Sequence, residues 1–189
     1  MTTAWPFGDL KLFGYDLIVI DAPWPFSLHS VKGEGKSAAR HYATMPLEKI
    51  AALPVGQLAR ADTLLLCWVT APLLDKCLDV VRGWGFTYKT NLSWRKMTPG
   101  GKVRMGTGYC ARTMHETVLL TTIGHPVFKP MPSSFDGLAR QHSRKPDEFY
   151  DMVSRCCPQL QFRADVFART RRFGWDSHGD ELDKFDSHS

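Results

Sequence analysis

The 189-residue sequence lacks any apolar run approaching the roughly 20 residues that span a bilayer, which argues against a membrane protein. Its first residues, MTTAWPFGDL, lack the basic start and apolar stretch of a signal peptide. The five cysteines are odd in number, form no C-x-x-C pair and belong to no His/Cys cluster at zinc spacing. We therefore expect a cytoplasmic protein with reduced thiols, no bound metal and no membrane partner.

The composition is ordinary for a soluble globular protein, with 43% hydrophobic and 23% charged residues. The length suits a single domain over residues 1–189. A net charge of +5 permits a polyanionic partner such as nucleic acid without requiring one. Basic residues gather at 95–96, 140–145 and 169–172, where solvated faces are the alternative interpretation.

Short apolar runs alternate with segments of helical period. Strands are predicted at residues 15–21, 63–69, 86–96, 115–122 and 160–167, and helices at residues 46–58 (broken by Pro54), 73–84 and 145–157. The segments 25–45, 98–109 and 124–141 lack a clear period and are predicted to be loops. This alternation predicts an α/β fold whose mostly parallel sheet is covered by helices on both faces.

The strand at residues 15–21 ends in a carboxylate and then turns through Ala22-Pro23-Trp24. Ligands of open α/β sheets lie outside the carboxyl ends of strands, although Asp21 is equally suited to a cap or turn. A proline here fixes the chain direction, so a neighbouring carbonyl can face the cleft beside the carboxylate. Two such acceptors suit an amine with two hydrogens, and Trp24 could stack on its ring or belong to the core. The pattern therefore fits a flipped-out adenine.

Several spaced motifs resemble the adenine-N6 methyltransferases of the MT-A type, which methylate mRNA and, in bacteria and phages, are expected to methylate DNA. DAPW at residues 21–24 resembles the family's catalytic D-P-P-W, and HYATM at 41–45 its Y-x-T-M. TLLLCWVT at 63–70, WGF at 84–86 and WRK at 94–96 resemble the following strands and helix. HSRKPDE at 142–148, VFARTRRFGW at 166–175 and GDE at 179–181 resemble its cofactor-binding end. The resemblance extends over roughly residues 15–181.

The resemblance implies a Rossmann-like methyltransferase fold, with the catalytic motif before the cofactor motif and S-adenosylmethionine as methyl donor. It implies that Asp21 and the Ala22 carbonyl accept hydrogen bonds from the adenine amine, while Pro23 and Trp24 shape the base site. Substrate-binding roles are implied for Tyr42, Lys96 and Glu116. The cofactor-binding residues that it implies are Asp21, Ser143, Lys145, Asp165, Phe167, Arg169, Thr170, Arg171, Asp180 and Glu181.

Two positions depart from the family pattern. Ala22 replaces the first proline, but we expect activity to survive because the backbone carbonyl makes the contact. Arg171-Arg172 is more basic than the family's cofactor loop, and residues 169–172 also fit a solvated turn. Lys145 likewise fits an exposed position before a helix.

We expect a DNA adenine-N6 methyltransferase that binds nucleic acid, with a homodimer as a candidate assembly. The alternatives are an enzyme acting on RNA and a catalytically silent nucleic-acid-binding subunit of the same fold. The basic loops at residues 96–112 and 140–144 are where we expect contacts to phosphates.

Overall fold

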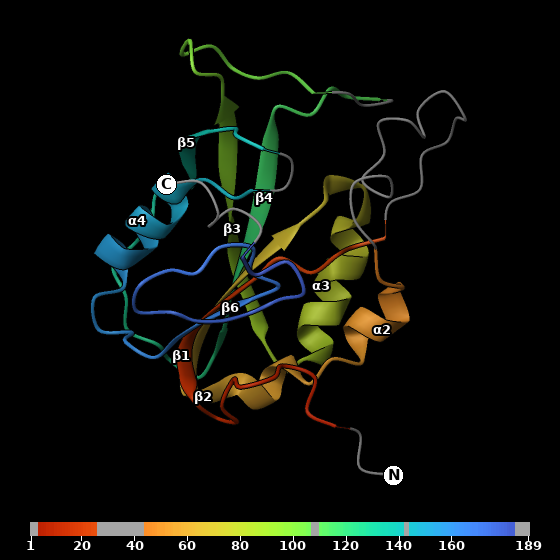
Figure 1. The fold of residues 1–189 in the computed structure, drawn as a ribbon, viewed down its shortest axis with the longest axis vertical. Helices are drawn as coiled ribbons and strands as arrows, with labels where there is room; N and C mark the ends of the chain where they lie inside the picture. Colours follow the sequence, from red (N-terminus) through yellow and green to blue (C-terminus); the bar gives the residue numbers. More distant parts are fainter. Residues whose placement is uncertain (1–3, 26–43, 107–109, 142–143, 184–189) are drawn as a thin grey trace.

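The computed structural model describes residues 4–25, 44–106, 110–141 and 144–183. Within these ranges the strands form one sheet in the order β5-β3-β4-β2-β1-β6-β7 (Figure 1). Their bounds are β1 Tyr15–Ile20, β2 Ala59–Val69, β3 Thr87–Met97, β4 His115–Ile123, β5 Ser134–Leu138, β6 Arg163–Val166 and β7 Asp176–His178. The α-helices are α2 Leu47–Ala51, α3 Leu74–Gly83 and α4 Asp147–Cys156, and short 3-10 turns cover Val55–Leu58 and Ala71–Leu73.

Among these strands, β4 alone runs against the direction of the others. It pairs antiparallel with both β2 and β3, whereas every other pairing in the sheet is parallel. The start of β4 therefore lies at the edge where β2 and β3 end, with Thr117 opposite Val69 and Glu116 opposite Trp94. The reversal brings an acidic residue to the carboxyl edge of the sheet, where ligands of α/β folds bind.

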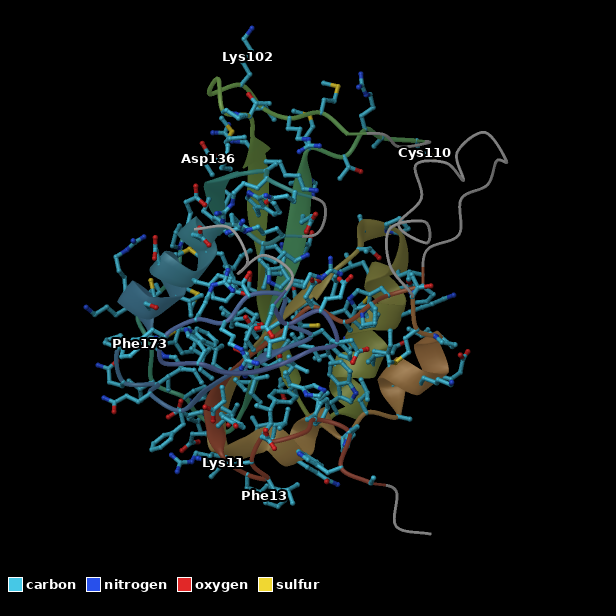
Figure 2. All side chains as sticks on the ribbon, viewed as in Figure 1. Lys11, Phe13, Lys102, Cys110, Asp136 and Phe173 are labelled. Carbon is cyan, nitrogen blue, oxygen red and sulfur yellow. The ribbon has the colours of Figure 1, made fainter. Side chains whose placement is uncertain are left out.

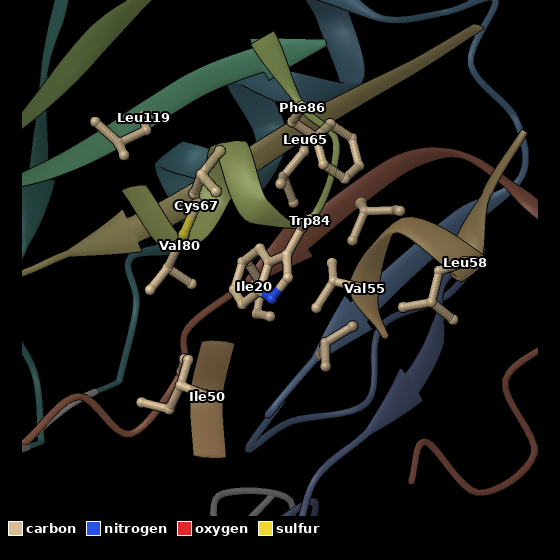
Figure 3. Packing of buried hydrophobic residues seen from close by; sticks show 14 of the residues in the cluster. Ile20, Ile50, Val55, Leu58, Leu65, Cys67, Val80, Trp84, Phe86 and Leu119 are labelled. Carbon is tan, nitrogen blue, oxygen red and sulfur yellow. The ribbon is translucent and has the colours of Figure 1, made fainter. Parts of the chain in front are cut away.

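Helices cover both faces of the sheet, as the sequence predicts. Successive residues of a strand point to opposite faces, so Ile18 and Ile20 of β1 pack on one side and Leu17 and Val19 on the other. Figure 1 shows α2 and α3 to the right of the sheet and α4 to its left. In Figure 3, the α3 side of the core packs around Trp84, with Ile20 and the residues of the 3-10 turn close by.

The core under α4 is built largely from aromatic rings. Phe149 of α4 is fully buried, and its ring centroid lies 4.8 Å from that of Trp68 in β2. It also contacts Tyr150 edge to face at 5.1 Å and Phe135 of β5 at 6.0 Å. Such pairs add to the stability that apolar burial itself provides.

The five strands predicted from the sequence are all present, with shifted ends. The predicted helix at residues 46–58 divides at Pro54 into α2 and a 3-10 turn, as the proline requires. The prediction of a continuous loop at residues 124–141 is wrong, because Ser134–Leu138 forms β5. β7 was also missed. Both are short strands at the edges of the sheet, and their Ser, Asp, Gly and His residues give no apolar signal.

No helix in the described ranges is long and apolar enough to cross a membrane. The same ranges contain no group of three or more His, Cys, Asp or Glu side chains arranged to hold a metal ion.

Replacing Phe149 with alanine is expected to lower the free energy of unfolding by about 3–5 kcal/mol, because it leaves a cavity among packed rings. Phe173→Ala is the matched control, since that ring is fully exposed and projects from the surface beside α4 (Figure 2). Its cost should stay within about 0.5 kcal/mol. Urea unfolding monitored by circular dichroism measures both, and equal losses would contradict the described core.

Candidate active site

The turn after β1 fixes the direction of the chain at Asp21. The Asp21 amide donates to the Val166 carbonyl of β6 at 3.2 Å, which continues the sheet pairing by one residue. The Trp24 amide then donates to the Ala22 carbonyl at 2.8 Å, closing a three-residue turn around Pro23. The Ala22 carbonyl is therefore held in place although alanine replaces a proline.

The Trp24 side chain anchors this turn to the sheet. Its indole Nε1 donates to the Trp68 carbonyl at 2.8 Å, and the residue is 5% exposed within the core that contains Ile20. So little exposed ring leaves a small area for stacking on a base. Of the two sequence interpretations, the structure favours the core position, from which Trp24 sets the shape of the turn.

Lys145 joins the two acidic residues of the site. Its ammonium nitrogen lies 3.0 Å from Asp21 Oδ2 and 3.1 Å from Glu116 Oε2. Its side chain is 12% exposed and lies over the Trp68 ring at 4.8 Å. The alternative that Lys145 is an exposed residue before a helix is therefore wrong. Lys96 at the end of β3 pairs with the other Glu116 oxygen at 2.5 Å. Positive and negative groups therefore alternate along the row Lys96–Glu116–Lys145–Asp21.

Burial and the neighbouring charges shift the protonation of these groups. Burial is the main cause that raises the pKa of Asp21 above its ordinary value, and Glu116 adds to it, while Lys145 and Arg169 oppose it. Burial would also raise the pKa of Glu116, but Lys145 and Lys96 outweigh it and lower that pKa to about 2. The two acids raise the pKa of Lys145 against the effect of its burial. At neutral pH, Glu116 is therefore a carboxylate and Lys145 an ammonium.

A pocket of about 310 Å³, including open space at its mouth, lies beside Asp21. It is formed by the turn after β1, the start of α4 and the segment that follows β6. Of the residues implied to bind the cofactor, it brings together Asp21, Lys145, Asp165, Phe167, Arg169 and Thr170. It also contains Arg144, which was expected to contact phosphates, and three residues that the sequence did not assign individually to a site: Tyr150, Ala168 and Arg172.

Asp165 is buried at the inner end of this pocket. The Tyr150 hydroxyl donates to Asp165 Oδ2 at 2.9 Å, and Arg172 Nη1 lies 3.7 Å from the same oxygen. The Arg172 guanidinium also lies over the Tyr150 ring, 3.5 Å from its centroid. Burial raises the pKa of Asp165 to about 7, although Arg172 and the Tyr150 hydroxyl act against it. The solvated-turn interpretation of residues 169–172 is thus wrong for Arg172, whose side chain is 16% exposed.

A tight backbone arrangement brings the C-terminal motif to this pocket. Phe167 has a φ of 61°, in the left-handed region, and the Ala168 amide donates to the His178 carbonyl at 2.9 Å. A Cβ on Gly179 would lie 2.4 Å from the Ala168 carbonyl oxygen, so only glycine fits there. Glu181 can thereby pair with Arg169 at 3.3 Å.

A second, more open hollow of about 800 Å³, including open solvent, contains three further residues implied to bind the cofactor, Arg171, Asp180 and Glu181. Its lining also includes Gly179, Leu182 and Asp183, and Arg171 Nε pairs with Asp183 at 2.9 Å. The Arg169–Glu181 ion pair connects this hollow with the first pocket. Tyr42 and Ser143, also named from the sequence, lie outside the described residues.

The donor set of the two hollows fits S-adenosylmethionine. Lysine and arginine side chains suit the carboxylate of its methionine part, and Asp or Glu side chains suit an ammonium or ribose hydroxyls. The Phe167 ring adds an apolar surface next to the buried Asp165. The described residues that would hold such a cofactor are those that line the two hollows, where Tyr150 and Arg172 lie beside residues that the resemblance implies.

Two of the missed residues, Tyr150 and Arg172, gave only weak signals in the sequence. Tyr150 lies five residues after Lys145 on a predicted helix, where its hydroxyl reaches the end of β6. The only sign of Arg172 in the sequence is that it belongs to the basic cluster at residues 169–172.

Comparison with known proteins agrees with this geometry. The sequence model of the MT-A70 family matches residues 15–181. The Type II methyltransferase M.MunI of a Mycoplasma species is 26% identical, over 93% of this chain and 81% of that protein. The N6-methyladenosine RNA methyltransferase MTA1 of Cryphonectria parasitica is 28% identical over 90% of this chain, and the mouse N(6)-adenine-specific methyltransferase METTL4 is 26% identical over 90%. The chain spans 52% and 38% of those two proteins.

Asp165 is expected to make folding less favourable as the pH rises from about 4 to about 7. In this window the folded protein keeps the proton that the unfolded chain releases, so stability falls by up to about 1.4 kcal/mol per pH unit. Asp165→Asn should lack this decline, and the stability difference between wild type and variant should change across the window. Tyr150→Phe removes a hydrogen bond that lowers the pKa, so its decline should extend above pH 7. Parallel stability curves for wild type and Asp165→Asn in urea titrations would contradict this assignment.

Proposed function

The chain belongs to the MT-A70 family of adenine-N6 methyltransferases, and on this premise we propose that it methylates the N6 amine of adenine in DNA, with S-adenosylmethionine as donor. The observation that carries the proposal is the pair of acceptors at the end of β1. Asp21 and Ala22 are adjacent in a fixed turn, and Asp21 lines the pocket.

Both acceptors keep capacity for an amine. A carboxylate has about four lone-pair sites, of which the Lys145 ammonium uses one, and a carbonyl has two, of which the Trp24 amide uses one. The adenine amine is a poor nucleophile because its lone pair is delocalised into the ring. Hydrogen bonds from both of its hydrogens favour a more tetrahedral nitrogen and direct the lone pair toward the cofactor pocket.

The cofactor supplies a methyl group on a sulfonium sulfur, which leaves as a neutral thioether when the amine nitrogen takes the methyl. The methylated nitrogen then carries one proton too many. Asp21 is the acceptor closest to that proton, and its raised pKa suits it to take the proton and release it to water. Lys145 and Arg169 would hold the anionic end of the cofactor, and Asp165 and Glu181 its hydrogen-bond donors.

DNA is the preferred substrate because the bacterial relative that is covered over most of its length is a Type II methyltransferase. The fungal relative named as an RNA methyltransferase supports RNA as the second candidate. The basic segment between β3 and β4 fits either polyanion. It contains Lys102, Arg104 and Arg112 and no acidic residue, and it projects beyond the sheet with Lys102 near its tip (Figure 2).

Asp21→Asn is expected to lower the rate of methyl transfer at least a hundredfold, because one of the two acceptors for the amine loses its charge. Binding of the cofactor, measured by calorimetry, should weaken much less. The matched control is Asp79→Asn, an exposed aspartate on α3 whose ion pair with Arg82 lies on the surface. The assay uses labelled donor with single-stranded DNA, duplex DNA and RNA of the same sequence. Methyl transfer by Asp21→Asn at the wild-type rate would contradict the role of Asp21. Labelling of RNA alone would show that RNA, not DNA, is the substrate.

The affinity for duplex DNA is expected to fall steeply with salt, because binding to phosphates releases counterions. Lys102→Gln should reduce the slope of log affinity against log salt by about one, as expected for one lost phosphate contact. Lys89→Gln at the opposite end of β3 is the control and should leave the slope unchanged. Fluorescence anisotropy at several salt concentrations measures the slopes, and identical slopes for all three proteins would remove Lys102 from the DNA interface.

A further inference from the structure

Lys96 is directed toward Glu116 and not toward open solvent. It lies two residues after Trp94 on β3, on the same face of the strand, and Trp94 is paired with Glu116 across the sheet. Its ammonium nitrogen contacts Glu116 Oε1 and lies 5.3 Å from the centroid of the Trp94 ring. With 23% of its side chain exposed, Lys96 is not placed like the freely projecting Lys102.

The row Lys96–Glu116–Lys145–Asp21 has two positive and two negative groups and is neutral as a whole. Each of its inner members is shared, since Glu116 binds one lysine through each oxygen and Lys145 binds one acid on each side. Its four members come from β3, β4, the segment just before α4 and the turn after β1. A change at the Lys96 end is therefore transmitted to Asp21 by charge, without direct contact between the two.

We propose that Lys96 is a positioning residue for methyl transfer: it occupies one oxygen of Glu116, which leaves Lys145 shared with Asp21 and keeps Asp21 an ionised acceptor. The proposal rests on the function proposed above, and it gives Lys96 a different role from the substrate contact expected from the sequence.

Loss of the Lys96 charge has a defined consequence for the row. Glu116 would then have both oxygens available to Lys145 and would draw that ammonium away from Asp21. The row would also carry a net negative charge, which disfavours the ionised form of Asp21. A protonated Asp21 has one oxygen that donates instead of accepting, so it holds the adenine amine less well.

Removing the charge of Glu116 has the opposite effect on Asp21. A neutral side chain there leaves Lys145 to Asp21 alone, which favours the ionised carboxylate. The other charged groups that act on Asp21 are Arg169 from the segment after β6 and Asp165 at the end of β6. Arg169 and Asp165 are not substituted in the variants of Lys96 and Glu116, so the effects of these two substitutions on Asp21 can be compared directly.

The experiment compares wild type with Lys96→Met, Lys96→Arg and Glu116→Gln, and uses Lys89→Met as the control on the same strand. The rate of methyl transfer to adenine-containing DNA is measured against pH. Lys96→Met should move the acidic limb of the kcat profile upward by roughly half a unit to one unit, and Glu116→Gln should move it downward. Lys96→Arg should restore the wild-type limb, while KM for DNA changes less than about twofold in Lys96→Met.

A carboxyl titration of Asp21 by NMR in the protein without substrate gives a readout that needs no turnover. The Asp21 signal should titrate at a higher pH in Lys96→Met and at a lower pH in Glu116→Gln, with urea unfolding as the check that both variants are folded. An inactive wild type with these NMR shifts would reject the proposed function and keep only the effect of Lys96 on the ionisation of Asp21. An unmoved Asp21 titration, or a raised KM with a reduced salt slope and an unchanged acidic limb, would overturn the inference and return Lys96 to the substrate interface.

Discussion

One buried ammonium group, that of Lys145, holds the site together. It pairs with Asp21 after β1 and with Glu116 at the start of β4, two residues that are 95 positions apart in the sequence. Removing either acid or the lysine leaves a charge in a poorly solvated place, which is costly, so the three segments are constrained together. The antiparallel direction of β4 is what makes the arrangement possible, because a parallel strand would place its second residue at the far edge of the sheet.

The turn at Asp21 shows how a site tolerates the loss of a rigid residue. Alanine at position 22 removes one ring that would restrict the backbone. The hydrogen bond from the Trp24 amide to the Ala22 carbonyl and the anchor from the Trp24 indole to β2 provide the restriction by other means. The buried indole thus fixes the turn beside Asp21 and leaves little ring surface for stacking. Rigidity at Ala22 depends on packing around Trp24 more than on the residue at position 22 itself.

The parts that the sequence predicted share a physical cause. Strands at the centre of the sheet are buried on both faces, so residues 17–20 and 64–69 form continuous apolar runs. Asp21 can be recognised from the sequence because it directly follows the first of these runs. The edge strands β5 and β7 have a partner on one side only and carry polar residues, so no such run marks them. The pairing of Lys96 with Glu116 was also hidden, because it requires the direction of β4. The aromatic and basic wall formed by Tyr150 and Arg172 depends on the packing of α4 against the end of β6, which no local pattern contains.

The neighbouring positions of β1 and β6 explain why two motifs so distant in sequence lie at one place in the structure. Ile20 pairs with Val166, so the residues that follow each strand, Asp21 and Phe167, leave the sheet side by side. From β1 the chain continues to α2 and β2 on one side, whereas β6 is entered from α4 on the opposite face. Strand order changes direction at this point, which is where open α/β sheets leave a crevice for ligands. The crevice contains two acids whose pKa values are raised and whose neighbours differ. Asp21 faces Lys145, which also binds Glu116, whereas Asp165 faces the Tyr150 hydroxyl and Arg172. Under the proposed function, Asp21 therefore keeps acceptor capacity for an amine, while Asp165 uses its oxygens within the wall of the pocket.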